Sequence, residues 1–262
     1  MRITRFRHAA GIDYGILDDK EGITFLAASP FASLETTGET ISVNQVDLLA
    51  PVQPPNILAI GKNYAEHAQE TGSDLPDHPL LFLKATTTLT GPDTAIVLPC
   101  EAPDEVDYEA ELAVVIGHKA KNVTESDAAD YILGYTCAND VSARDCQLRH
   151  DKQWARGKSF DTFCPMGPWI ETRLDTARCR ITSRVNGEVR QSSTTAEMIF
   201  NCHNLVSYLS QQMTLLPGTV ILTGTPSGVA MAGNPPRYLK DGDTCEVEVE
   251  GIGVLRNYVH AE

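Results

Sequence analysis

The residues with the clearest chemical potential lie in the run Asp107-Tyr108-Glu109-Ala110-Glu111-Leu112-Ala113-Val114-Val115-Ile116. Its apolar end predicts a buried strand. Because alternate side chains of a strand face the same way, Glu109 and Glu111 are expected on one side, about 6.6 Å apart along the strand. Two such carboxylates repel each other unless a cation or a proton lies between them. The alternative is an acidic strand end whose side chains lie in water.

A third carboxylate, Asp140, favours the cation. It follows an apolar stretch, residues 132–139, that is typical of a second buried strand. Ser142 and Asp145 have the spacing of a capping box, which predicts that a helix begins there. Three hard oxygen donors without a nearby Cys–His set suit Mg²⁺, Mn²⁺ or Ca²⁺ better than Zn²⁺. Three such ligands also leave coordination positions for water and substrate.

His67 and Glu70 form a second candidate group. On a short helix they are neighbours on one face, and a carboxylate beside an imidazole orients the ring and raises its basicity, as general acid–base catalysis requires. A surface helix with an incidental pair is the alternative. Residues 71–79, which include two prolines, predict an irregular loop able to close over a site as a lid. Lys158, in a glycine-flanked loop, is either solvated or, in a cleft, paired with a substrate carboxylate or oxyanion.

The composition bounds the class of protein that carries these groups. The chain has 262 residues and a formal net charge of −14, an acidic balance that opposes binding to nucleic acids and to anionic membranes. No apolar run has the length of a membrane span, and the N-terminus does not resemble a signal peptide. The seven cysteines are odd in number and lack a C-x-x-C pair, which indicates buried thiols in a reducing compartment. We therefore expect a soluble cytoplasmic protein.

Short strands must position the candidate residues. Three prolines between positions 51 and 55 predict a boundary between a small N-terminal domain, residues 1–52, and a main domain, residues 53–262. Because strands outnumber helices and do not alternate regularly with them, the pattern favours an α+β fold, mainly β, with helices packed outside the sheets. Trp154 and Trp169 are expected in the core. The elements expected are a hairpin at residues 3–27, strands at 80–83, 112–116, 219–222 and 245–250, and helices at 124–131 and 196–213.

Six segments, in this order along the chain, resemble the motifs of the fumarylacetoacetate hydrolase family, in particular its acylpyruvase and 2-hydroxyhepta-2,4-diene-1,7-dioate isomerase branch. They extend from about residue 55 to residue 228, and six motifs in register are specific although each alone is weak. The segments are Gly61-x-Asn63-Tyr64-x-x-His67-x-x-Glu70, Phe82-Leu83-Lys84, Asp107-Tyr108-Glu109-Ala110-Glu111, Asn139-Asp140-Val141-Ser142-Ala143-Arg144-Asp145-x-Gln147, Lys158-Ser159-Phe160-Asp161 and Thr223-Gly224-Thr225-Pro226.

The resemblance implies a mixed β-sandwich roll as the catalytic domain, usually in a homodimer, with a small anionic oxo acid as substrate. It also implies Mg²⁺ or Mn²⁺ as cofactor, for which Ca²⁺ can substitute. The implied metal ligands are Glu109, Glu111 and Asp140, and His67 and Glu70 match a dyad that activates water. Arg144, Gln147 and Lys158 match residues near the substrate oxygens, and Thr225 lies in a turn that lines the pocket.

These features predict a metal-dependent hydrolase that cleaves a C–C bond in an acylpyruvate-like or fumarylpyruvate-like 2,4-dioxo acid. The metal and Lys158 would stabilise the enolate that leaves. The same apparatus serves decarboxylation of oxaloacetate-like 2-oxo acids and isomerisation of 2-hydroxy-diene diacids in aromatic catabolism, so these reactions are the alternatives. A non-catalytic binding domain with the same fold is a third hypothesis, and it predicts no binding of a divalent metal.

Overall fold

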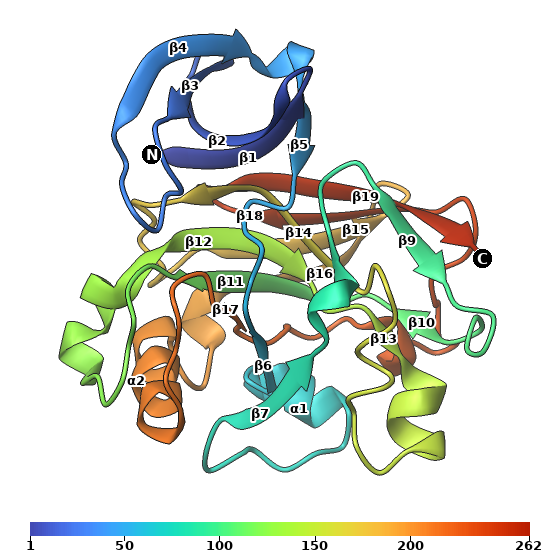
Figure 1. Cartoon of the computed structure of the whole chain (residues 1–262). Coiled ribbons are helices and arrows are strands. Elements are labelled where there is room, and N and C mark those ends of the chain that lie inside the picture. Colours follow the sequence, from blue (N-terminus) through green and yellow to red (C-terminus); the bar gives the residue numbers. More distant parts are fainter.

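The computed structural model describes residues 1–262, and strands far outnumber helices (Figure 1). This confirms the predicted α+β, mainly β class. No helix has both the length and the apolar character needed to cross a membrane. The strands that share the largest sheet are β1 (Arg2–His8), β2 (Gly11–Leu17), β3 (Gly22–Leu26), β4 (Thr36–Ser42), β5 (Asp47–Leu49), β6 (Ile57–Gly61), β7 (Leu80–Lys84), β8 (Leu89–Thr90), β11 (Ala110–Ile116), β12 (Ile132–Asn139), β14 (Cys164–Glu171) and β17 (Val220–Leu222).

This sheet continues from the N-terminal strands into the main body of the protein. Its main path runs β4-β3-β2-β1-β14-β12-β11-β17-β6-β7, with β5 beside β1 and β8 beside β14. Residues 3–27, predicted as one hairpin, contain three antiparallel strands: β2 and β3 form the two arms expected around the turn at residues 18–22, and β1 pairs with β2 as an additional strand. The N-terminal strands β1 to β5 stand apart at the top of Figure 1 and close around Phe6, Leu17 and Ile23. Pairing of Arg2 and Ile3 with β14 joins them to the rest.

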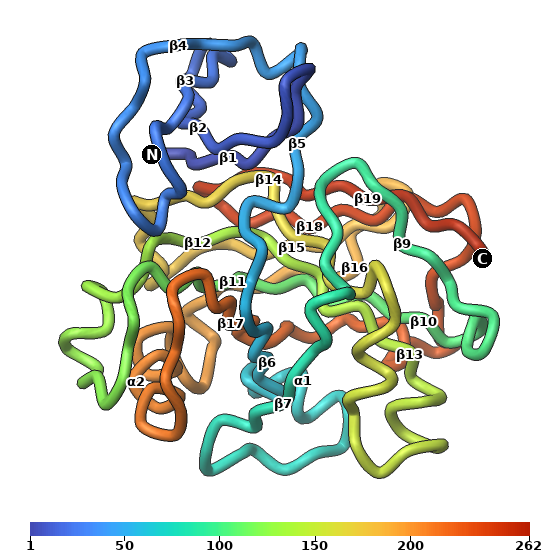
Figure 2. Tube along the Cα trace, in the orientation of Figure 1, coloured from blue at the N-terminus to red at the C-terminus, as the bar shows by residue number.

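Two smaller sheets complete the β structure. The five-stranded sheet has the order β16-β15-β18-β19-β9, and a two-stranded sheet pairs β10 with β13. Figure 2 shows how β9, from early in the chain, lies beside the C-terminal strand β19, with which it pairs in parallel. The bounds are β9 (Ala95–Leu98), β10 (Val106–Asp107), β13 (Ser142–Ala143), β15 (Arg180–Val185), β16 (Glu188–Thr194), β18 (Thr244–Val249) and β19 (Gly253–Ala261).

Strand β11 lies between two hydrophobic clusters. Leu112, Val114 and Ile116 pack in the cluster that also contains residues of α2 (Cys202–Gln212) and of the five-stranded sheet. Ala113 and Val115 point the other way, into a cluster with residues of β6, β14 and β17. Burial on both faces explains why this strand is a continuous apolar run instead of an alternating one. The pattern at β18 is the opposite, with buried and partly exposed side chains alternating as predicted.

The helical segments differ in part from the predictions. The helix expected at residues 196–213 is a short 3₁₀ turn followed by α2, because Asn201 caps α2 through its contact with the amide of Asn204. Residues 125–131 form a 3₁₀ helix. The prediction of a capping box at Ser142 and Asp145 was wrong, since Ser142 lies in β13. A π-helix begins only at Cys146, with Asp145 as its cap. The remaining α-helix is α1 (Ala65–Glu70).

The expectation that residues 80–83 form a buried strand was also wrong. Strand β7 exists, but it lies at the end of the large sheet, where it pairs only with β6. Leu80 and Leu83 are 39% and 53% exposed. A run of four apolar residues does not show whether the strand has a neighbouring strand on both sides or on one side only. Periodicity alone therefore could not distinguish an edge strand from a central one.

Candidate active site

Strand pairing brings the three predicted carboxylates together. Ala110 pairs with Asn139 in the antiparallel ladder of β11 and β12, and the next step of that ladder places Asp140 opposite Glu109, where the Asp140 amide donates to the Glu109 carbonyl at 2.9 Å. Glu111 is two residues along on the same face. The ligand atoms of Glu109, Glu111 and Asp140 lie within 4.8 Å of one another, and all three residues are buried. The alternative of a solvated acidic strand end was therefore wrong.

Three buried cations surround these carboxylates. Lys158 donates to both Glu109 Oε2 and Asp140 Oδ2 at 2.8 Å. Lys84, at the end of β7, donates to Asp140 Oδ1. Arg144 is 2.7 Å from Glu109 Oε1 and 2.9 Å from Oδ2 of Asp107, another buried carboxylate. Lys158 is only 2% exposed, so the expectation of a solvated lysine was wrong and its partners are carboxylates of the protein.

The charges of this cluster do not balance when all of its carboxylates are ionised. Four carboxylates (Asp107, Glu109, Glu111 and Asp140) face three cations (Lys84, Arg144 and Lys158). Burial, together with the charges of Asp140 and Glu109, raises the pKa of Glu111 well above its usual range, although the Gly224 amide donates to this carboxylate at 2.7 Å. In Glu109, burial acts in the same direction, but Lys158 and Arg144 outweigh it and lower the pKa. A proton on Glu111 or an additional cation would relieve this excess of negative charge.

The donor set fits a divalent metal ion of the hard type. Carboxylate oxygens are the ligands that Mg²⁺, Mn²⁺ and Ca²⁺ prefer, and this cluster contains no thiol or imidazole that would favour zinc. Glu109, Glu111 and Asp140 would hold the ion. A second group of possible ligands, Asp145, Cys146 and His150, mixes donor types and includes an exposed histidine, so it does not fit as well.

Metal affinity is expected to rise with pH because the ion must displace the proton from Glu111. Between the ordinary pKa of 4.5 and the raised pKa of this group, each pH unit should strengthen binding by up to about tenfold, since one proton is released per ion bound. Calorimetric titration with Mn²⁺ at several pH values, in buffers of different ionisation enthalpy, measures both the affinity and the proton release. Affinity that is constant from pH 5 to pH 8, with no proton released, would contradict the assignment.

His67 and Glu70 face each other on α1 as predicted. Nδ1 of His67 lies 2.8 Å from Oε1 of Glu70, and the Gly228 amide donates to both oxygens of Glu70 at 3.0 and 3.2 Å. Glu70 is thus held in place, and it fixes the orientation of the imidazole. The helix begins after Asn63, whose amide group donates to the carbonyls of Phe200 and Thr223. These contacts tie α1 to the turn that follows β17.

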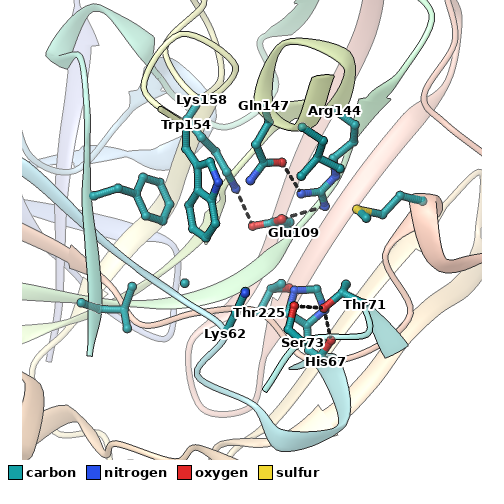
Figure 3. A pocket seen from close by; sticks show the side chains of 15 residues that line it. Lys62, His67, Thr71, Ser73, Glu109, Arg144, Gln147, Trp154, Lys158 and Thr225 are labelled. Carbon is teal, nitrogen blue, oxygen red and sulfur yellow. Dashed lines mark hydrogen bonds and ion pairs between the residues drawn. The ribbon is translucent and has the colours of Figure 1, made fainter. Parts of the chain in front are cut away.

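The dyad and the carboxylate cluster meet at one cavity of about 360 Å³ (Figure 3). The predicted site residues that line this cavity are His67, Glu109, Arg144, Gln147, Lys158 and Thr225. Glu111 and Asp140 do not line it and are almost completely buried. Glu70 lies behind His67, which it contacts. Figure 3 shows Glu109 between Lys158 and Arg144, with Thr71, Ser73 and His67 across the cavity from Gln147. Thr71 and Ser73 belong to the predicted lid segment.

The sequence patterns left several residues of the site without a role. Trp154, expected in the core, lines the cavity beside Phe82, and its ring lies so close to Gly61 that a Cβ there would come within 2.6 Å. Lys84 and Asp107 were part of recognised motifs but had no predicted function. The contacts of Asp107 cross between distant segments, so no local signal marks it. Lys84 has one local signal, because a lysine that directly follows an apolar run is at risk of burial, and a buried charge needs an ionic partner.

Comparison with known families and structures gives a consistent assignment. Residues 56–260 match the family model described as "Fumarylacetoacetate (FAA) hydrolase C-terminal", and residues 1–51 match the one described as "Rv2993c-like, N-terminal". Protein Rv2993c of Mycobacterium tuberculosis is 43% identical over 99% of this chain and 98% of that protein. The mitochondrial oxaloacetate tautomerase Fahd2a of Rattus norvegicus is 47% identical over 82% of this chain and 70% of that protein.

Solved structures agree over the full length. The 5-carboxymethyl-2-hydroxymuconate delta-isomerase from Mycobacterium smegmatis superimposes with a TM-score of 0.91 at 44% identity, covering 100% of both chains. The 2-hydroxyhepta-2,4-diene-1,7-dioate isomerase from Mycobacterium marinum has a TM-score of 0.90 at 40% identity and covers 100% of this chain and 99% of its own. The fold, the domain matches and these identities agree with the resemblance found in the motifs. The chain therefore belongs to the fumarylacetoacetate hydrolase family.

Proposed function

We propose that the protein is a divalent-metal-dependent enzyme that interconverts the keto and enol forms of a small 2-oxo diacid. The observation that carries this proposal is that one cavity is lined both by the oriented imidazole of His67 and by Glu109 of the carboxylate cluster. Keto–enol conversion needs a base beside the carbon next to a carbonyl, and it needs positive charge to stabilise the enolate that results. Relatives named as an oxaloacetate tautomerase and as an isomerase of a diene diacid support the same class of reaction.

The metal, when bound, supplies positive charge that stabilises the enolate oxygen and orients the 2-oxo acid. Glu109, Glu111 and Asp140 would hold it. Lys158, which lies between two of these carboxylates, adds a fixed positive charge at the same side of the cavity. Such charges act strongly because the site is buried and little solvent screens them.

His67 would move the proton. Its Nδ1 is engaged by Glu70 at 2.8 Å, which leaves Nε2 to accept a proton from the substrate carbon and to return it to carbon or oxygen. Glu70 itself acts as a positioning residue, held by the Gly228 amide. Phe82 and Trp154 form an apolar part of the cavity wall and reduce the access of water to the enolate.

Hydrolysis of a C–C bond in a 2,4-dioxo acid is the second candidate. The same His67–Glu70 pair that accepts a proton from carbon can accept one from a water molecule that attacks the distal carbonyl. Decarboxylation of a 2-oxo acid differs from both, because it requires stabilisation of the enolate but no base to begin the reaction. The presence of an oriented base in the cavity therefore favours the first two reactions over the third.

Three assays on one preparation distinguish these reactions. Oxaloacetate freshly dissolved in its enol form is followed by the loss of enol absorbance, with Mg²⁺ or Mn²⁺ and with EDTA. Acetylpyruvate is followed by pyruvate formation, and oxaloacetate by release of carbon dioxide. We expect the enzyme with metal to accelerate enol loss above the rate without enzyme and above the rate with EDTA, without release of carbon dioxide. Pyruvate formed from acetylpyruvate at a higher kcat/KM would favour hydrolysis, and no enol loss above the rate without enzyme would refute the proposal.

A further inference from the structure

Lys62 occupies an unusual position in the wall of the active-site cavity. It lies between the end of β6 and the start of α1, with a φ of 56° that lysine seldom adopts. In this left-handed conformation the chain turns sharply after Gly61. The next side chain, Asn63, is completely buried and bonded to two backbone carbonyls, whereas Lys62 is only half-buried and lines the cavity.

The ammonium group of Lys62 has no partner in the protein. Three cationic or potentially cationic side chains besides Lys62 line the cavity, and each is engaged: Arg144 and Lys158 by carboxylates, and His67 by Glu70. No ion pair or side-chain hydrogen bond involves Lys62. Figure 3 shows its nitrogen directed into the cavity, on the side away from Lys158 and Gln147. In a chain with a net charge of −14, a free cation inside a cavity is available for a ligand.

The proposed function leaves a second anionic group without a binding partner. One carboxylate and the adjacent 2-oxo group of a 2-oxo diacid belong at the metal site, beside Lys158 and Gln147. The other carboxylate then lies elsewhere in the cavity and needs a positive charge of its own, because a buried anion without a partner is strongly disfavoured. Ser73 contributes a hydroxyl group to the same side as Lys62, and a hydroxyl is a suitable additional donor for a carboxylate. The hydroxyl of Thr71, which also lines this side, already donates to the His67 carbonyl at 2.9 Å.

We propose that Lys62 binds the carboxylate of the substrate that lies farthest from the metal, so that it selects diacids over monoacids. This inference rests on the proposed function, which places the 2-oxo end of the substrate at the metal. The role of Lys62 is in binding alone and does not depend on which reaction follows. An ion pair formed inside a cavity is expected to favour the diacid by about 10- to 100-fold in affinity, the range for a hydrogen bond between charged groups.

L-Malate and L-lactate test this inference as unreactive probes. Both chelate a divalent ion through a carboxylate and the neighbouring hydroxyl, and they differ in that malate has a second carboxylate where lactate has a hydrogen atom. Affinities are measured by calorimetry on the full chain in saturating Mg²⁺, for the wild type, Lys62→Met and Lys62→Arg. Methionine keeps an unbranched side chain and the same backbone preference, so the substitution removes the charge with little other change.

The wild type is expected to bind malate about 10- to 100-fold more tightly than lactate, and Lys62→Met to lose that difference. Lys62→Arg should retain most of it. Lys119→Met, which removes an exposed lysine outside the cavity, is the matched control and should behave as the wild type. Thermal unfolding verifies that all four proteins are folded. Equal affinity of the wild type for the two acids, binding of neither, or an equal loss for both in Lys62→Met would overturn the inference.

The enol assay separates this inference from the proposed function. Selection of malate that depends on Lys62, together with no catalysis on oxaloacetate, would refute the proposed reaction and retain the role of Lys62. Catalysis on oxaloacetate without selection of malate would retain the reaction and refute that role.

Discussion

Alanine at position 140 is expected to remove binding of a divalent metal and with it every activity of the site. Asp140 supplies one of three clustered carboxylates. Loss of an outer partner of a metal ligand typically weakens binding by about 10–100-fold, so loss of a ligand itself should exceed that range. Calorimetric titration with Mn²⁺ measures the affinity, and the assays with oxaloacetate and acetylpyruvate measure the activities.

The same substitution is expected to destabilise the metal-free protein. Lys84 would keep only the carbonyl of Val141 as a partner, at 3.2 Å, and would remain buried. Breaking a buried ion pair costs about 3–5 kcal/mol in the free energy of unfolding, which urea denaturation measures. Asp140→Asn keeps an acceptor for Lys84 and should be folded while still impaired in metal binding. Asp130→Ala, at an exposed site, is the control. Full activity of both variants at Asp140 would be incompatible with the site described.

Alanine at position 67 is expected to remove catalysis while leaving metal binding intact, in contrast to alanine at position 140. General acid–base catalysis contributes about 10²- to 10⁴-fold to a rate, so kcat for enol conversion should fall within that range. His67 lies outside the carboxylate cluster, so Mn²⁺ affinity should change by less than about twofold. Equal losses of activity and metal affinity would show that His67 is a ligand and would refute its role as base.

Glu70→Gln tests the positioning of that base. Glutamine retains a hydrogen-bonding group beside Nδ1 of His67 but removes the charge, so a smaller loss of kcat than in His67→Ala is expected. Glu66→Gln is a matched control, because Glu66 lies on the same helix and its carboxylate makes one hydrogen bond, accepted from the Ser227 hydroxyl. If the two glutamine variants are equally active, Glu70 has no function in catalysis.

Local sequence patterns predicted the strands that carry the site better than they predicted their surroundings. The apolar runs after Glu111 and before Asp140 are buried on both faces, and burial of this kind leaves a clear signal in residue type. Strand β7 has the same apolar character yet forms a sheet edge. Ser142 has the composition of a helix cap, but pairing with Asp107 places it in a short strand. In both cases tertiary pairing overrides local preference.

The metal ligands, the dyad and the neutralising cations all lie in the motifs, but the pairing of Lys84, Arg144 and Lys158 with the carboxylates was not predicted. Glu109 and Asp140 meet because of the register between β11 and β12, which the sequence alone does not specify. Lys84, Lys158 and Arg144 reach the cluster from separate segments, and each of these lysines resembles an ordinary surface residue in its own sequence neighbourhood. These cations are buried because they pair with carboxylates of other segments, so their burial cannot be predicted from each segment alone.

Titration of the metal-free protein with Mn²⁺, for the wild type and for Glu111→Gln, tests whether Glu109, Glu111 and Asp140 form a metal site. Glutamine at this position preserves the size of the side chain and the contact with the Gly224 amide. It removes the carboxylate whose pKa is raised by burial and by the charges of Asp140 and Glu109, an excess of negative charge that a bound cation would relieve. We predict that the wild type binds one Mn²⁺ per chain and that the variant binds more than about 100-fold more weakly. Absence of binding to the wild type in millimolar Mn²⁺, or equal affinity of the two proteins, would show that these carboxylates do not hold a divalent ion.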